Sequence, residues 1–153
     1  MITYREMNAL DLPMVVSMER QVYRSDAWSV AQFKEELASV PRNRYYIVAR
    51  DEQNHIVGYA GAFSPDTGLD ADVLTLTVAP SWRRKGIGRA MLNQLIAWAK
   101  ERNAPVIFLE VREGNVEASP LYESAGFVAI SSRSNYYSMG VNAVIMKKDL
   151  NDV

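Results

Sequence analysis

A run of three cations, residues 83–85, stands directly before two glycines spaced one residue apart, Gly86 and Gly88. An apolar run ends at Val78, shortly before them, and apolar residues recur at helical spacing after them. Glycine lets the backbone approach a ligand closely, and the first N–H groups of a helix have no intrahelical partners. A strand, a basic glycine loop and a helix in this order predict a site for a phosphate-bearing ligand.

Two other phosphate-binding loops fit this stretch less well. A dinucleotide-binding loop would carry its third glycine at the position of Met91, and it would follow a strand near the start of a βαβ unit. A Walker loop ends in Gly-Lys-Ser or Gly-Lys-Thr, and that triplet does not occur in the chain.

Glu110 is the most informative side chain outside the loop. It interrupts the apolar run 106–111, where a buried carboxylate is costly without a partner. One explanation is an ion pair with Arg112, which lies on the same face of the predicted strand. The explanation that we favour is a general base, because Glu110 lies at the C-terminal end of a predicted sheet strand, where ligand sites of α/β proteins tend to lie.

The composition limits the class of protein. With 153 residues, 48% of them hydrophobic, the chain suits a single domain over residues 1–153. A net charge of −1 argues against a nonspecific nucleic-acid surface.

No apolar run approaches the roughly 18 residues of a membrane span, and the N-terminus is unlike a signal peptide, so we expect no membrane contact and a cytoplasmic location. Without cysteine, acyl transfer must avoid a cysteine intermediate. We expect no metal, and the oligomeric state stays open.

The hydrophobic pattern predicts eleven elements in the order βααβββαβαββ. Helices interleaved with strands indicate an α/β sandwich around a mixed sheet. The almost continuous apolar run 106–111 predicts a strand covered by helices on both faces. The predicted strands are residues 2–5, 45–49, 56–63, 73–78, 106–111, 127–131 and 143–146, and the predicted helices are residues 12–22, 29–38, 88–103 and 115–126.

The chain resembles the GCN5-related N-acetyltransferase (GNAT) superfamily. Residues 83–88 match its loop Arg/Gln-x-x-Gly-x-Gly/Ala, which binds the pyrophosphate of acetyl-coenzyme A. A second motif of the superfamily is matched downstream by Asn115, Ala118, Leu121, Tyr122, Gly126 and Phe127. The resemblance implies the fold of that superfamily, with helices on both faces of a mixed, mostly antiparallel sheet.

The same resemblance implies roles for individual residues. Acetyl-coenzyme A would be the cosubstrate, and Tyr122 would protonate the departing thiolate, although packing between helix and sheet is the alternative for this ring. Asn115 would bond the pantetheine amides, and it could also cap its helix. The implied coenzyme-binding residues are Leu76, Val78, Arg83, Arg84, Lys85, Gly86, Ile87, Gly88, Arg89, Asn115 and Tyr122.

Further segments, residues 27–29, 109–112, 135–137 and 143–146, are similar to members that acetylate the N-terminal alanine of small-subunit ribosomal protein eighteen. That similarity implies a protein N-terminus as the partner. Trp28 and Tyr137 could wall the acceptor slot, and core packing is the alternative for each. The chain has Ala27 and Thr77 where such members usually have proline and alanine, which leaves details of the acceptor open. A lysine side chain, a small amine, or a non-catalytic sensor of acetyl-coenzyme A are the alternatives.

Overall fold

The computed structural model describes residues 1–112, 118–134, 136 and 140–151. A seven-stranded sheet in the order β1-β2-β3-β4-β5-β7-β6 forms its centre. The strands are β1 (Thr3–Glu6), β2 (Arg44–Arg50), β3 (Ile56–Phe63), β4 (Ala71–Val78), β5 (Val106–Arg112), β6 (Val128–Arg133) and β7 (Ala143–Asp149). The helices are α1 (Leu12–Tyr23), α2 (Val30–Ala38), α3 (Ile87–Glu101) and α4 (Ala118–Ser124), with short 3-10 turns at Ala9–Asp11, Arg24–Asp26 and Pro80–Trp82.

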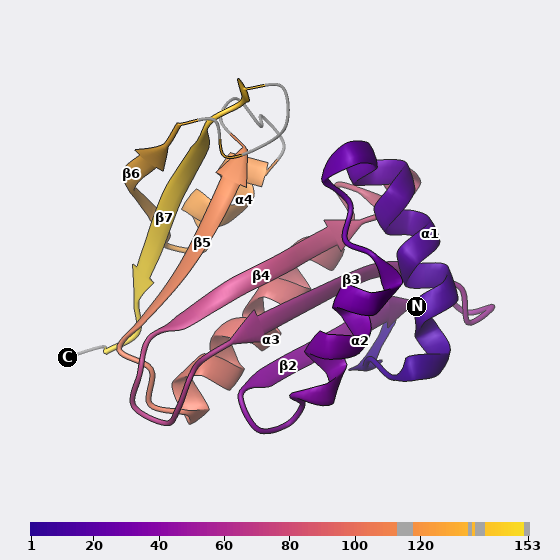
Figure 1. Cartoon of the computed structure of the whole chain (residues 1–153), viewed down its shortest axis with the longest axis horizontal. Coiled ribbons are helices and arrows are strands. Elements are labelled where there is room, and N and C mark those ends of the chain that lie inside the picture. Colours follow the sequence, from indigo (N-terminus) through magenta and orange to yellow (C-terminus); the bar gives the residue numbers. More distant parts are fainter. Residues whose placement is uncertain (113–117, 135, 137–139, 152–153) are drawn as a thin grey trace.

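The sheet is open in its middle. Every neighbouring pair of strands is antiparallel except β4 and β5, which run parallel. That parallel pairing covers only two positions, Ala71 with Ile107 and Asp72 with Phe108. Beyond these positions the two strands diverge, as Figure 1 shows, so among the described residues no strand pairs with the rest of β4 on the side of β5.

Helices cover both faces of the sheet. Helices α1 and α2 pack on one face, where Val15, Phe33 and Tyr59 belong to one buried cluster. Helix α3 packs on the other face, against β2, β3 and β4 (Figure 1). This arrangement confirms the predicted fold class, an α/β sandwich around a mixed, mostly antiparallel sheet with helices on both faces.

The helix boundaries follow from local chemistry. Ser29 caps α2 by accepting a hydrogen bond from the Gln32 N–H, and the Gln32 side chain accepts one from the Ser29 N–H in return. Pro13 lies in the first turn of α1, where a missing N–H costs nothing. Helix α3 begins after Gly86, which has a φ of 83° that suits glycine.

One expectation about β5 is wrong. The strand is not covered on both faces, because burial alternates along it. Ile107, Leu109 and Val111 are buried against α3 and α4, whereas Glu110 and Phe108 lie on the less buried face. The apolar run misled because Phe108 lines a cavity beside the open part of the sheet instead of packing under a second layer of helices. Periodicity cannot distinguish those environments.

The close packing of Tyr46 on Gly61 provides a test of the fold. These residues are partners across β2 and β3, and a Cβ on Gly61 would lie 2.0 Å from the Tyr46 ring. Gly61→Ala should therefore lower the free energy of unfolding by about 2–3 kcal/mol, measured by urea denaturation. In a Tyr46→Val background, which removes the ring, the same substitution should cost much less. An equal cost in both backgrounds would contradict this account.

Candidate active site

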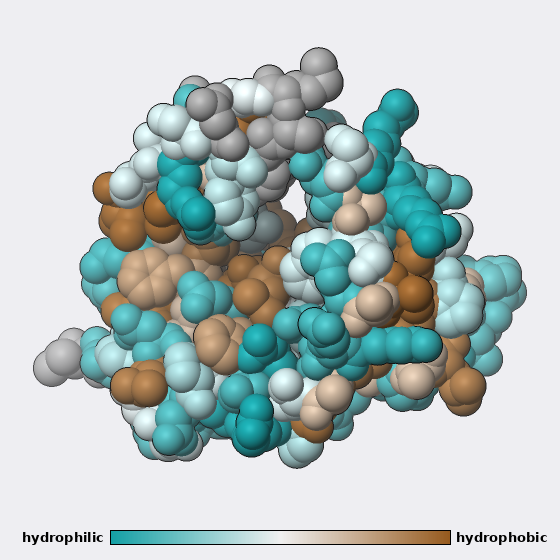
Figure 2. Space-filling model, in the orientation of Figure 1, coloured by the Kyte–Doolittle hydropathy of each residue, from teal (hydrophilic) through white to brown (hydrophobic). Residues whose placement is uncertain are grey.

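Two cavities meet beside the opening of the sheet. The larger one, about 770 Å³, lies between the diverging parts of β4 and β5 and is called the cleft below. The smaller one, about 450 Å³, lies against residues 82–89 and is called the loop cavity. Figure 2 shows the surface hollowed between the two sides of the sheet. Tyr23, Leu76, Ala118 and Tyr122 line both cavities, so they mark the junction.

The glycine loop has the geometry of an anion site. Arg84 and Gly86 have positive φ values of 62° and 83°, which turn the chain sharply into α3. Gly86 caps the helix without a side chain, and its carbonyl accepts the first intrahelical bond, from Ala90. The intervening N–H groups of residues 87–89 are the ones that a helix leaves without intrahelical acceptors. They stand at the loop cavity, where an anion is stabilised.

The predicted coenzyme residues lie mostly at this cavity. Leu76, Val78, Arg83, Arg84, Gly86, Ile87, Gly88, Arg89 and Tyr122 line it. The Arg83 side chain is held by the loop itself, because its Nε donates to the carbonyl of Val78 over 3.1 Å. Arg89 donates to Ser124 over 2.8 Å and so ties α3 to α4. Lys85 is exposed and is not among the lining residues.

Gly88 lies at a close contact between the first turn of α3, β4 and α4. A Cβ there would lie 3.3 Å from Leu121 and 3.6 Å from Val78. A methyl group at this position would require Leu121 to shift by a few tenths of an ångström, so a small residue suits the close contact of α3 with β4 and α4. The loop therefore combines a close approach, unpaired N–H groups and cations, which fits a pyrophosphate.

Glu110 lies in the cleft and is paired, but not with Arg112. Its Oε1 accepts from Arg133 over 2.8 Å, and its buried Oε2 has no hydrogen-bond partner among the described residues. Arg112 instead pairs with Asp26 over 2.9 Å. The proposed Glu110–Arg112 pair is therefore wrong, because each side chain finds its partner on another element. A carboxylate with one buried free oxygen can accept a proton.

Tyr122 occupies the junction of the two cavities. It is 7% exposed, and its ring packs edge-on against Phe127 at a centroid distance of 6.1 Å. The ring thus packs as the alternative expects, while its role as an acid stays a prediction. Its place on α4 puts it between the loop cavity and the cleft that holds Glu110.

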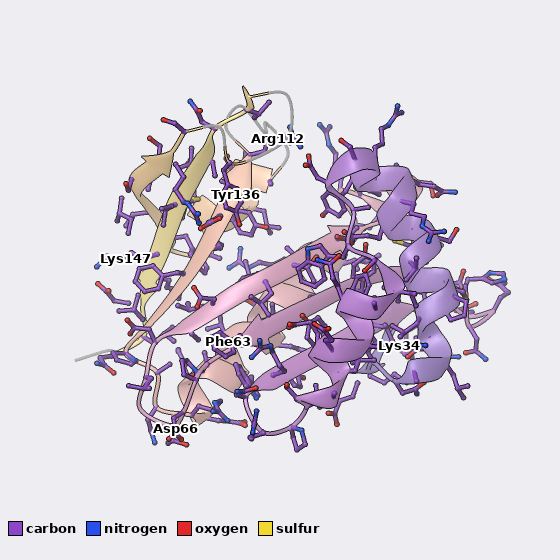
Figure 3. The ribbon with its side chains drawn as sticks, viewed as in Figure 1. Lys34, Phe63, Asp66, Arg112, Tyr136 and Lys147 are labelled. Carbon is purple, nitrogen blue, oxygen red and sulfur yellow. The ribbon has the colours of Figure 1, made fainter. Side chains whose placement is uncertain are left out.

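The side of the cleft opposite β5 comes from the connection between α1 and α2. Trp28 lines the cleft and also packs against Phe33, with ring centroids 5.2 Å apart. Asp26 reaches across to Arg112. Figure 3 shows Arg112 and Tyr136 beside the opening, on the side of β5 and β7. The Arg133 guanidinium lies 4.3 Å from the centre of the Tyr136 ring. Asn115 and Tyr137 lie outside the described residues, so their roles stay predictions.

Several cleft residues were not found from the sequence. Glu19 on α1 is 2% exposed and accepts from the Tyr59 hydroxyl and the Trp28 N–H. Burial raises the pKa of Glu19, although these two hydrogen bonds oppose the shift. Tyr23 shares a 2.7 Å hydrogen bond with Thr77. The sequence did carry a signal for Glu19: it lies on the apolar face of an amphipathic helix, together with Val15 and Val16.

Among the described residues, no group of three or more histidine, cysteine or acidic side chains could hold a metal ion. In the same part of the chain, no helix is long and apolar enough to cross a membrane.

The residues 10–127 match the family model for the acetyltransferase (GNAT) family. The chain therefore belongs to this family, which confirms the resemblance seen in the loop and in the second motif. Its members are acetyltransferases, so the family and the fold together define the class of enzyme.

Individual relatives match this chain over nearly its whole length. The N-alpha-acetyltransferase RimI of Mycobacterium tuberculosis is 34% identical, over 99% of this chain and 94% of its own length. The [ribosomal protein bS18]-alanine N-acetyltransferase of Escherichia coli is 32% identical, over 90% of this chain and 88% of its own. The crystal structure of the ribosomal-protein-S18-alanine N-acetyltransferase from Escherichia coli superposes with a TM-score of 0.84 at 28% identity, over 100% and 96% of the two chains.

The electrostatics of the cleft lead to a prediction for Asp72. Burial, with the nearby Glu110 and Asp70, raises the pKa of this carboxyl above its usual value of 3.8. A raised pKa means that the folded state binds the proton more tightly than the unfolded state, so ionisation of Asp72 opposes folding as the pH rises. Asp72→Asn should therefore raise the free energy of unfolding at pH 7, and the gain should shrink toward pH 4.

Denaturant titrations of both proteins at several pH values measure this difference. Asp66→Asn, at an exposed turn outside the cleft, is the control for the substitution itself. A gain for Asp72→Asn that stays constant from pH 7 to pH 4 would contradict the assignment.

Proposed function

We propose that this chain transfers acetyl from acetyl-coenzyme A directly to the N-terminal α-amine of a protein, and that the acceptor is the N-terminal alanine of ribosomal protein bS18. The observation that carries the proposal is the junction of the two cavities at Tyr122, with Glu110 on the cleft side. The names of the two relatives and their coverage of nearly the whole chain support the acceptor. The cytoplasmic location stays a prediction.

The loop cavity would hold the coenzyme. The N–H groups at the start of α3 would bind the pyrophosphate, and Arg84 and Arg89 would add positive charge. The side of β4 facing β5 has no strand beyond Asp72, so its backbone groups could bond the pantetheine arm. Acetyl-coenzyme A supplies the acetyl group as an activated thioester.

The chain's own residues would move two protons. Glu110, through Oε2 or a water held by it, would take one proton from the α-ammonium group and so free the nucleophile. Arg133 would keep the other oxygen in place. Tyr122 would give its hydroxyl proton to the departing sulfur, at the junction where the acceptor and the thioester must meet. The amine would attack directly, since no cysteine is present to carry the acetyl group.

Charge supports an amine as the acceptor. Four carboxylates, those of Glu19, Asp26, Asp72 and Glu110, line the cleft. Arg112 is paired with Asp26, and Arg133 with Glu110. An α-ammonium group entering between these side chains would find negative charge in partly buried surroundings, where it is screened less than in water. A lysine acceptor, with a pKa near 10.4, would need a stronger base or a more desolvating slot than an α-amine needs.

The acceptor is tested with labelled acetyl-coenzyme A and peptides. One series begins with a free Ala, Ser or Met, and another has a blocked N-terminus and an internal Lys. The peptide of bS18 with a free N-terminal alanine should be acetylated most efficiently, measured as kcat/KM. Acetylation of the internal Lys alone would reject an N-terminal acceptor, and tight coenzyme binding with no acetylation of any amine would indicate a sensor.

The two proton-transfer roles are tested by Glu110→Gln and Tyr122→Phe. Each substitution keeps the shape of the side chain, so coenzyme binding, measured by calorimetry, should be retained. The turnover number should fall roughly 10²-fold or more in each variant, because general acid–base catalysis contributes about this much. Glu123→Gln on α4 and Tyr45→Phe on β2 are matched controls away from both cavities and should keep full turnover. Full turnover in both active-site variants would refute the mechanism.

A further inference from the structure

Glu19 is a buried carboxylate without a cation. Its 2% exposure would make the charge costly, and no lysine or arginine forms an ion pair with it in the described part of the chain. Asp11, the other deeply buried acid there, is paired with Arg5. Glu19 instead accepts two hydrogen bonds from neutral donors, the Trp28 N–H at 2.9 Å and the Tyr59 hydroxyl at 2.6 Å.

The first of these contacts anchors the connection between α1 and α2. The Trp28 N–H lies two residues beyond the 3-10 turn Arg24–Asp26, and both Asp26 and Trp28 line the cleft. Because the Trp28 backbone is bonded to Glu19, the segment that forms this wall is tied to the body of α1. The hydrogen bond from the Trp28 N–H to Glu19 has a carboxylate acceptor. Such a bond is stronger than one between two neutral groups.

The second contact leads to the junction of the cavities. Tyr59 on β3 and Thr77 on β4 are partners in register, and their side chains interact. The Thr77 hydroxyl in turn shares a 2.7 Å hydrogen bond with the hydroxyl of Tyr23. Tyr23 lines both cavities, so the polar chain that begins at Glu19 ends where the acceptor and the coenzyme would meet.

We propose that Glu19 is a positioning residue that holds two parts of the acceptor wall at once: the Trp28 segment directly, and Tyr23 through Tyr59 and Thr77. It does not exchange protons with the substrate, since both of its oxygens are engaged inside the protein. The proposal rests on the proposed function, because it takes the cleft to be the acceptor site. Disturbing the network should weaken binding of the acceptor more than binding of acetyl-coenzyme A.

The chain contains a matched control for this network. Tyr46 on β2 is also fully buried, and its hydroxyl donates to a helix glutamate, Glu36, over 2.8 Å. Neither of these residues lines the cleft or the loop cavity. Tyr59→Phe and Tyr46→Phe therefore remove equivalent hydroxyls from the same face of the sheet, one inside the proposed network and one outside it.

The test measures steady-state kinetics with an N-terminal peptide and the melting temperature of each variant. Tyr59→Phe should raise the acceptor KM about 3- to 10-fold, as expected for one lost hydrogen bond, with the KM for acetyl-coenzyme A unchanged. Tyr46→Phe should lower Tm by a similar few degrees and leave both KM values unchanged. Equal acceptor KM values in the two variants would overturn the proposal.

Substitutions of Glu19 separate positioning from proton transfer. Glu19→Gln can still accept from the Trp28 N–H and donate to the Tyr59 oxygen, so it should keep turnover and the pH profile of the wild type. Glu19→Ala should raise the acceptor KM at least as much as Tyr59→Phe does. A roughly 10²-fold fall in turnover for Glu19→Gln would overturn the proposal by making Glu19 a base.

Amide hydrogen exchange gives a readout that needs no turnover. Exchange in residues 24–28 should be faster in Glu19→Ala than in Tyr46→Phe, because only the first removes the acceptor of the Trp28 N–H. Equal exchange would refute the anchoring even if the enzyme is active. Wild-type protein that acetylates no amine would refute the proposed function, while the exchange comparison would still decide the role of Glu19.

Discussion

The parallel pairing of β4 with β5 stops after two positions, and the architecture of the site depends on that limit. A parallel pair continued to Val78 would satisfy the backbone of both strands and close the sheet. Because the strands diverge instead, one side of β4 stays without a strand, and a cleft forms between Asp72–Leu76 and the facing part of β5. The register shift between β3 and β4, at Gly61 and Ala62, lies in the same region and bends the strand further.

Helix α3 packs against both halves of the divided sheet and so holds them together. Ile87, Met91 and Leu95 pack against β2 and β3 in one buried cluster. Leu92, Ile96 and Ala99 pack against β5, β7 and α4 in another. Neighbouring positions on one helix thus bury against the two sides of the opening. The same helix presents its N-terminus to the loop cavity, so the element that joins the halves also positions the anion site.

Three acidic side chains of the cleft each have a partner on another element. Glu110 is held by Arg133, Asp26 by Arg112, and Glu19 by hydrogen bonds alone. Each arrangement connects elements that are far apart in the chain, such as residues 26 and 112. The walls of the cleft are therefore fixed by polar contacts between its opposite sides, while the buried oxygen of Glu110 stays available for an incoming proton.

The sequence by itself determined the elements, the fold class and the family, because these depend on local patterns. Helical spacing from Met91 to Ala99, the turn at Gly86 and the order of the two motifs are all visible without coordinates. Tertiary structure decided what depends on neighbours distant in the chain. It replaced Arg112 by Arg133 as the partner of Glu110, left one face of β5 open, and placed Glu19 and Tyr23 at the cleft. Residue spacing along one strand could suggest Arg112, but only the pairing of β5 with β7 and β6 brings Arg133 to the carboxylate.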